Sequence, residues 1–167
     1  KQKQYYIIAG GGNVMANTRT ITKVGDPILR EKAVQVRRFN ETLANLLDDM
    51  AQTMYENEGI GLAAPQIGIS KQLIVVDEGE GEGLFEMVNP KIISAEGNES
   101  AIEYCLSVPG RGGRVTRATS ITVEAQDRYG KVFNVEAEGN LARVFQHEID
   151  HLQGILFIDV MTEEVDD

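Results

Sequence analysis

The segment Gln146–His151 constrains this chain more than any other, because it places two histidines and a glutamate on one short stretch. Apolar residues recur at helical spacing around it, so we predict a helix that begins near Gly139-Asn140, with Asn140 as N-cap, and ends at Gly154. Its apolar face consists of Leu141, Val144, Phe145 and Leu152. Glu148 continues that face, where a carboxylate is costly unless it has a function or a partner. The helix must therefore bury a polar site.

A metal centre is the interpretation that best fits this helix. His147 and His151, the only histidines in the chain, lie one turn apart and can reach one metal ion, while Glu148 can reach water bound to it. The alternative is a surface helix that carries two histidines by chance. A catalytic zinc-type site takes three protein ligands and leaves one position open. The sequence thus calls for a third ligand elsewhere.

Cys105 is the candidate for that ligand, because it is the only cysteine and lies where we predict the edge of a strand facing the helix. A thiolate beside two imidazoles suits iron, zinc, cobalt or nickel rather than magnesium or calcium. The alternative is a cysteine that acts as a small buried hydrophobe. Gln66 follows a stretch of glycine and alanine that lets a ligand approach, so its amide could donate to an oxyanion, or it is an ordinary loop glutamine.

Other periodic segments predict an α+β fold with two helices and several strands. A helix capped by Asn40 is expected from Leu43, Leu46, Leu47, Met50 and Met54, with its end at Gly59 and a shaped loop over residues 59–66. Two hairpins are expected, one joining 73–76 to 84–88 and ending at Asn89-Pro90, the other joining 121–126 to 132–137. Residues 155–160 are expected to be a final strand or extended segment.

Length and charge place the chain in one broad class. The 167 residues suffice for one domain with a real core, and the 42% apolar content is typical of a globular protein. The net charge of −10 argues against binding to nucleic acid or to an anionic membrane surface, and no apolar run approaches the ~20 residues of a membrane span. A lone cysteine fits a reducing compartment.

We expect the chain to divide into three regions. We expect residues 1–14 to be a leader from an expression vector or upstream translation, or to be disordered, with the native chain starting at Met15. Residues 15–161 are expected to form a single catalytic domain. Residues 162–167 are expected to form an acidic tail with nothing to bury.

Three blocks in this order resemble the signature motifs of the peptide deformylases, and the resemblance runs from about Thr20 to Met161. The blocks are Gly-Ile-Gly-Leu-Ala-Ala-Pro-Gln at 59–66, Glu-Tyr-Cys-Leu-Ser at 103–107 and Gln-His-Glu-Ile-Asp-His at 146–151. The middle block departs from the commonest family form, Glu-Gly-Cys-Leu-Ser, because Tyr104 replaces a small residue. The resemblance implies antiparallel or mixed sheets packed around a central metal-binding helix, with a second helix nearer the N-terminus.

The resemblance also implies a reaction, the removal of the N-formyl group from N-formylmethionyl peptides with release of formate. It implies one divalent ion held by Cys105, His147 and His151, with Fe²⁺ the native ion and Zn²⁺, Ni²⁺ or Co²⁺ able to occupy the site. Glu148 would be the general base. Charge on the formyl oxygen would be stabilised by the Gln66 side chain, the Leu106 backbone N–H and the metal.

Five residues are implied to bind the substrate. The backbone at Ile60 and Gly61 would pair with the extended peptide, Tyr104 would form the opposite wall, and Val144 and Arg143 would line the methionine pocket. Arg143 is expected at the rim with its charge in water, or as a plain solvated helix residue.

Glu103 and Arg117 are expected to form an ion pair that orients the cysteine strand, with Asp150 sharing the same cation. The alternative for each is a plain surface charge.

The expected partners are nascent formylmethionyl chains near the ribosome. No direct contact with nucleic acid or membrane is expected, and the expected state is a monomer or weak oligomer. The expected location is the cytoplasm, or an organelle if a transit peptide has been removed. Two other functions share these residues. One is a zinc endopeptidase with the His-Glu-x-x-His motif, and the other is a catalytically silent protein of deformylase-like fold that binds peptides.

Overall fold

A computed structural model describes residues 16–79 and 82–166, so the expected leader at 1–14 lies outside the described residues. Its elements are η1(Pro27–Arg30), α1(Glu41–Glu56), β1(Gly61–Ala63), η2(Ala64–Ile67), β2(Leu73–Val76), β3(Phe85–Glu96), β4(Glu99–Cys105), β5(Val108–Arg117), β6(Ser120–Gln126), β7(Val132–Glu138), α2(Gly139–His151), α3(Phe157–Val160) and β8(Glu163–Asp166). Among the described residues, no helix is both long enough and apolar enough to cross a membrane.

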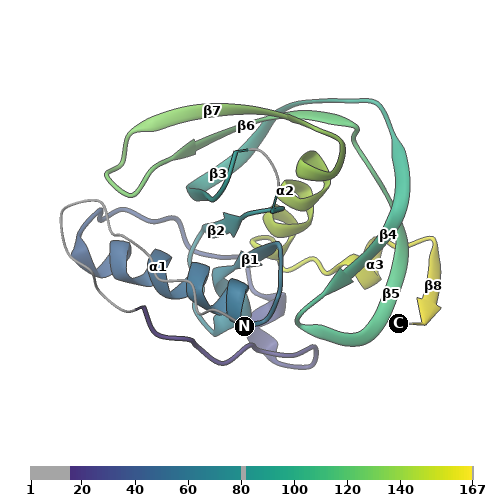
Figure 1. Cartoon of the computed structure of the whole chain (residues 1–167), viewed down its shortest axis with the longest axis horizontal. Helices are drawn as coiled ribbons and strands as arrows, with labels where there is room; N and C mark the ends of the chain where they lie inside the picture. The colour runs from purple at the N-terminus through teal and green to yellow at the C-terminus, as the bar shows by residue number, and fades with distance from the viewer. Residues whose placement is uncertain (1–15, 80–81, 167) are drawn as a thin grey trace.

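The strands form two antiparallel sheets, and α2 lies between them (Figure 1). The larger sheet has the order β1-β2-β3-β6-β7 and the smaller one has the order β4-β5-β8. Consequently β1 is an edge strand of one sheet and β4 is an edge strand of the other. The α+β class and the central helix are as the sequence predicts.

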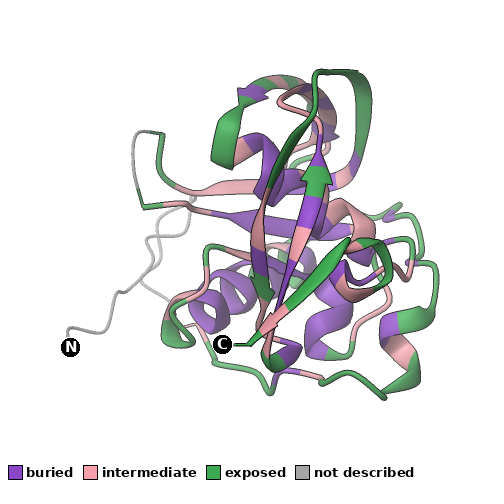
Figure 2. Ribbon diagram, turned by 90° about the vertical axis from the view of Figure 1, so that its right-hand side faces the viewer, coloured by how far each residue is buried: buried purple, intermediate pink, exposed green. Residues whose placement is uncertain are grey.

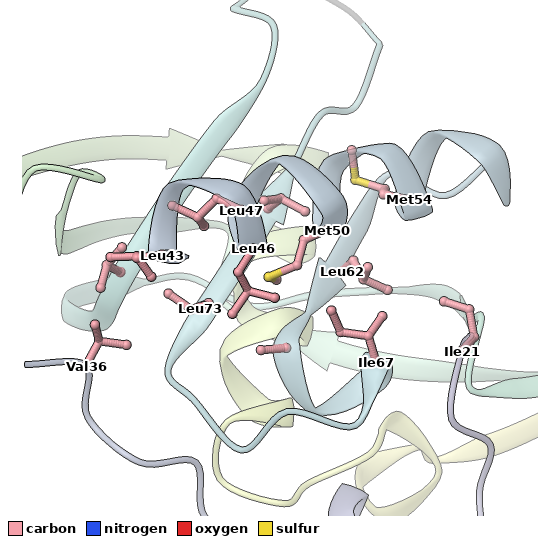
Figure 3. Packing of buried hydrophobic residues seen from close by; sticks show 13 residues of the cluster. Ile21, Val36, Leu43, Leu46, Leu47, Met50, Met54, Leu62, Ile67 and Leu73 are labelled. Carbon is pink, nitrogen blue, oxygen red and sulfur yellow. The ribbon is translucent and has the colours of Figure 1, made fainter. Parts of the chain in front are cut away.

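Strand β2 is buried on both faces, because each of the two long helices covers one of them. Leu73 and Val75 belong to the cluster packed under α1 (Figure 3), whereas Ile74 and Val76 belong to the cluster packed against α2. Alternation of side chains along a strand produces this division. Buried residues accordingly concentrate on α1, α2 and β2 (Figure 2).

Helix α1 confirms the helix expected from the leucine and methionine spacing. The Asn40 side chain accepts a hydrogen bond from the Leu43 N–H at 3.0 Å, which is the expected N-cap. The helix ends at Glu56 rather than at Gly59, with Asn57 as the C-cap. The expected loop over 59–66 is wrong in part, because Gly61–Ala63 pairs with β2 as strand β1 and Ala64–Ile67 forms a short 3₁₀ helix.

Both expected hairpins are present, but β3 does not end at Asn89-Pro90. The strand continues to Glu96 because Pro90 lies at a shift of register between Val88 and Lys91. A proline is tolerated at such a bulge because its missing N–H leaves no ladder bond unmade. The Asn89 side chain holds the bulge by hydrogen bonds to the backbone of Val36.

The start of α2 also differs from expectation. The N-cap is Glu138, the last residue of β7, and Asn140 lies inside the helix and donates from its side chain to Glu78. The helix ends at His151, and Gly154 follows with a positive φ of 76°. The residue after β7 therefore enters the helix directly.

The C-terminal expectations are wrong because partners distant in sequence decide this region. Residues 157–160 form the short helix α3 instead of a strand. Within the expected acidic tail, Glu163–Asp166 form β8, which pairs with β5 from Arg111 to Arg114. Arg111 and Arg114 form ion pairs with Glu164 and Glu163, so the acidic strand meets a basic one.

Asp159 provides a pH-dependent test of α3. Its carboxylate accepts from the Leu156 N–H at 2.8 Å and pairs with Arg30. Burial alone would raise its pKa, but Arg30 and the Leu156 N–H hold the pKa below its ordinary value of 3.8. A carboxyl group with a lowered folded-state pKa stabilises the fold above its ordinary pKa, and this contribution disappears as pH falls through the folded-state value. We expect Asp159→Asn to unfold at lower urea than the parent at pH 7, with the difference shrinking below about pH 4. A difference that grows on acidification would contradict this assignment.

Candidate active site

Helix α2 presents three side chains of the expected site, His147 and His151 toward β4 and Glu148 toward β1. His147, Glu148 and His151 have exposed fractions of 8%, 4% and 1%. The helical repeat brings positions 147 and 151 to the same side, and their ring centroids lie 5.2 Å apart. The helix therefore buries its two imidazoles and one carboxylate together.

Cys105, the last residue of β4, completes this group. Its Sγ lies 3.4 Å from His151 Nε2, and one ligand atom each from Cys105, His147 and His151 lie within 4.8 Å of one another. These distances suit three ligands around one ion, and the thiolate and imidazole donors suit a transition metal or zinc. The expected placement of Cys105 on a strand facing the helix is confirmed.

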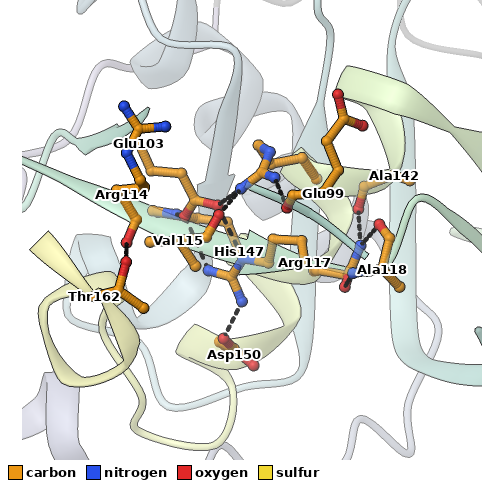
Figure 4. A network of polar contacts seen from close by, with 12 residues as sticks. Glu99, Glu103, Arg114, Val115, Arg117, Ala118, Ala142, His147, Asp150 and Thr162 are labelled. Atoms are coloured by element: carbon orange, nitrogen blue, oxygen red, sulfur yellow. Dashed lines mark hydrogen bonds and ion pairs between the residues drawn. The ribbon is translucent and has the colours of Figure 1, made fainter. Parts of the chain in front are cut away.

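Glu103 anchors this site through a network of charged contacts (Figure 4). Its carboxylate lies 2.8 Å from His147 Nδ1 and accepts two hydrogen bonds from Arg117, each 2.9 Å long. Arg117 also donates to Asp150 at 2.6 Å, which confirms the expected shared cation. Burial alone would raise the pKa of Glu103, but hydrogen bonds from Arg117 and His147 hold it well below its ordinary value of 4.5. The contact with Nδ1 leaves Nε2 of His147 for a metal ion.

The contact between Glu103 and His147 was missed by sequence reasoning, although the sequence holds a signal for it. Side chains two apart on a strand share a face, and Glu103 stands two residues before Cys105. A carboxylate at that position must therefore face the same histidines of α2 that Cys105 faces.

Arg143 differs from its expected position at the rim. It is 8% exposed and donates to Glu103 at 2.8 Å and to the carbonyl oxygens of Val115 and Glu99. Its charge therefore does not reach water, because buried acceptors on two strands hold it. Arg143 still lines the cleft described below.

Gln66 is buried beside Cys105 rather than placed on an open loop. Its Nε2 lies 3.6 Å from Cys105 Sγ and donates to Ser107 Oγ at 3.1 Å, while its Oε1 accepts from the Ala63 N–H at 2.9 Å. Leu106 lies between Cys105 and Ser107, and its carbonyl oxygen accepts from Lys23. The Gln66 amide thus contacts the residues on both sides of Leu106 in the chain, Cys105 and Ser107.

Gly61 and Glu148 show how closely β1 approaches α2. A Cβ atom on Gly61 would lie 2.5 Å from Glu148 Oε2 and 2.9 Å from Val144 Cγ1. Glu148 Oε1 is buried and has no hydrogen-bond partner among the described residues. Burial raises the pKa of Glu148 from its ordinary value of 4.5 to about 7. This carboxylate is suited to exchange a proton near neutral pH.

A cleft of about 620 Å³ opens over these groups and takes its walls from both sheets and α2. Ile60 and Gly61 line one wall, Tyr104 lines another, and Val144 lines the interior. Ile60 is 44% exposed and Tyr104 is 54% exposed. All the substrate-binding positions expected from the sequence therefore meet at one cleft.

Comparison with known proteins identifies the family. The family model described as polypeptide deformylase matches residues 18–166. The chain belongs to the polypeptide deformylase family. A peptide deformylase of Halothermothrix orenii is 57% identical over 139 residues, which are 83% of this chain and 90% of that protein. It follows that the chain is a hydrolase that removes the N-formyl group from nascent polypeptides.

Solved structures agree with this assignment. The crystal structure of peptide deformylase from Thermotoga maritima has a TM-score of 0.85 at 41% identity, covering 87% of this chain and 99% of that one. The structure from Legionella pneumophila has a TM-score of 0.84 at 46% identity, covering 87% of this chain and 86% of that one. These likenesses confirm the α+β fold and favour deformylation over the endopeptidase and silent-protein alternatives.

Substitution of Arg117 tests the network of contacts around Glu103. In Arg117→Met the carboxylate of Glu103 loses two hydrogen bonds and holds His147 less firmly, so we expect affinity for Zn²⁺ to fall about tenfold or more. Competition with a coloured chelator measures the affinity. Arg114→Met is the matched control, because Arg114 lies on the same strand with a side chain that is 43% exposed. Equal zinc affinity in both variants would discard the orienting role.

Proposed function

We propose that Cys105, His147 and His151 hold one divalent metal ion during deformylation, with Fe²⁺ the native ion and Zn²⁺, Ni²⁺ or Co²⁺ able to replace it. Two imidazoles and a thiolate are the donor set that supports this ion class. When bound, the ion would act as a Lewis acid that lowers the pKa of water and polarises the formyl carbonyl group.

Glu148 is the general base in this proposal, and its burial without a partner for Oε1 is the observation that carries the assignment. Its carboxylate takes a proton from the water that attacks the formyl carbon. It then delivers this proton to the peptide nitrogen as the carbon–nitrogen bond breaks, so that formate and a free amine leave. A pKa near 7 suits both transfers.

Gln66 and Leu106 stabilise the charge that develops on the formyl oxygen. The Gln66 amide is held by contacts at both ends, to Ala63 and Ser107, so its donor is fixed before substrate arrives. Fixed donors aimed at developing charge need no reorganisation during the reaction. The backbone N–H of Leu106 is the second donor.

The peptide lies extended between the two sheet edges, pairing with backbone groups of Ile60 and Gly61. Edge strands β1 and β4 supply this arrangement. Val144 and the aliphatic stem of Arg143 border the pocket for the methionine side chain, while Tyr104 forms the opposite wall. Binding through the backbone lets one enzyme accept many sequences.

The chain acts as a single catalytic domain that meets nascent chains near the ribosome, as a monomer or weak oligomer without nucleic-acid contact. Because formylmethionyl chains arise where translation begins, the matching location is the cytoplasm or an organelle with its own translation.

Formate release tests the proposed metal dependence. Protein purified without oxygen is expected to release formate from formyl-Met-Ala-Ser, to stop when a chelator is added, and to resume when Fe²⁺ is restored. A formate-oxidising coupled assay gives the rate. Formate release that is indifferent to metal removal and return would overturn the metal proposal, and cleavage of an internal bond in unformylated peptide would favour the endopeptidase.

Glu148→Gln tests the proton transfer separately from the metal. We expect kcat to fall by roughly 10²- to 10⁴-fold while metal content matches the parent, because the three ligands remain. Glu136→Gln is the control, since Glu136 is an exposed glutamate on β7. Full activity in Glu148→Gln would remove Glu148 from the mechanism.

A further inference from the structure

Tyr104 lies on the face of β4 that is turned away from α2. Its neighbours Glu103 and Cys105 contact the histidines of α2. Tyr104 is opposite Gly112 in the register of β4 and β5. A Cβ atom built on Gly112 would lie 2.5 Å from Tyr104 Cε1, and its three nearest atoms all belong to the tyrosine ring. The ring therefore covers the backbone of Gly112.

Gly112 is explained by this ring and not by its backbone conformation. It is absent from the described glycines that have a positive φ, so other residues could adopt its conformation. The space above it is taken by the ring, much as an aromatic side chain covers a cross-strand glycine in other sheets. One side of the ring is thus fixed against the backbone, while the residue as a whole is 54% exposed.

The fixed ring borders the cleft, where Ile102, Gly110 and Arg111 join it in the lining. Side chains of an added strand alternate between its two faces. If the first side chain of the peptide enters the pocket at Val144, on the α2 side, the second points to the face that carries Tyr104. This step rests on the proposed function, which places the extended peptide between the edges of β1 and β4.

We propose that Tyr104, seated on Gly112, is a specificity-determining residue that favours formylmethionyl peptides with an aromatic or large apolar second residue. The ring offers apolar surface that the second side chain covers, and contact between aromatic rings adds to the area buried. A glycine at the second position gains neither contribution.

The test compares kcat/KM for formyl-Met-Phe-Ser with kcat/KM for formyl-Met-Gly-Ser. The parent prefers the phenylalanine peptide, and Tyr104→Gly lowers this ratio roughly threefold to tenfold, the range of a single aromatic contact. Tyr104→Phe keeps the ratio because the ring remains. Tyr129→Gly is the control, since Tyr129 is an exposed tyrosine in the turn between β6 and β7, and it leaves the ratio at the parent value.

A double-mutant cycle separates the effect of the contact between the Tyr104 ring and Gly112 from general effects on folding. Gly112→Ala displaces the ring and lowers the ratio while Tyr104 is present. In the Tyr104→Gly background the same alanine no longer meets the ring that supplies its three nearest atoms, so it leaves the ratio of that background unchanged. If Gly112→Ala changes the kcat/KM ratio equally in both backgrounds, the proposed role of the contact between Tyr104 and Gly112 is overturned.

The two levels of proposal fail in different ways. Formate from both peptides, with a ratio that Tyr104→Gly does not change, overturns the specificity role and leaves the deformylase mechanism intact. No formate from either peptide with metal-loaded parent protein overturns the proposed mechanism itself.

Discussion

The Glu103 carboxylate is the contact on which the site depends, because it joins β4, β5 and α2 at one buried point. It binds Arg117 from β5 and both Arg143 and His147 from α2. With Asp150, two carboxylates face two guanidinium groups and the ring of His147. Removing one partner of a buried pair leaves an uncompensated charge and typically costs about 3–5 kcal/mol. The orientation of His147 and the attachment of the small sheet to α2 therefore depend on the same carboxylate.

The cleft follows from the presence of two sheets rather than one. Edge strands expose unpaired backbone groups and usually require protection from other chains. Here β1 and β4 are edge strands of different sheets and both contribute residues to the cleft. The same groups that would be a liability at an open edge can bind an extended peptide. Helix α2 closes the space between the edges and brings the chemically active side chains to it.

The sequence predicted correctly those features that depend on a pattern within one segment. It failed where a segment's structure depends on contacts with residues distant in sequence. The apolar spacing of α1 and the two histidines of α2 are local patterns, so both helices and the grouping with Cys105 could be predicted. Strand β8 is acidic and shows no apolar alternation, and its strand structure consists of pairing with β5, whose arginines also form ion pairs with it. Arg143 was predicted to be exposed for the same reason. Its hydrogen-bond acceptors, on Glu99, Glu103 and Val115, belong to β4 and β5, which are distant from it in sequence.

Two glycines that need no special backbone conformation lie against side chains that line the cleft. Neither Gly61 nor Gly112 is among the described glycines with positive φ. At Gly61 the missing Cβ leaves room for the Glu148 carboxylate, and at Gly112 it leaves room for the Tyr104 ring. In the proposed mechanism, the first glycine lets the substrate strand approach Glu148, the proposed general base. The second leaves room for a bulky ring at the rim of the cleft, on the face of β4 opposite to Glu103 and Cys105.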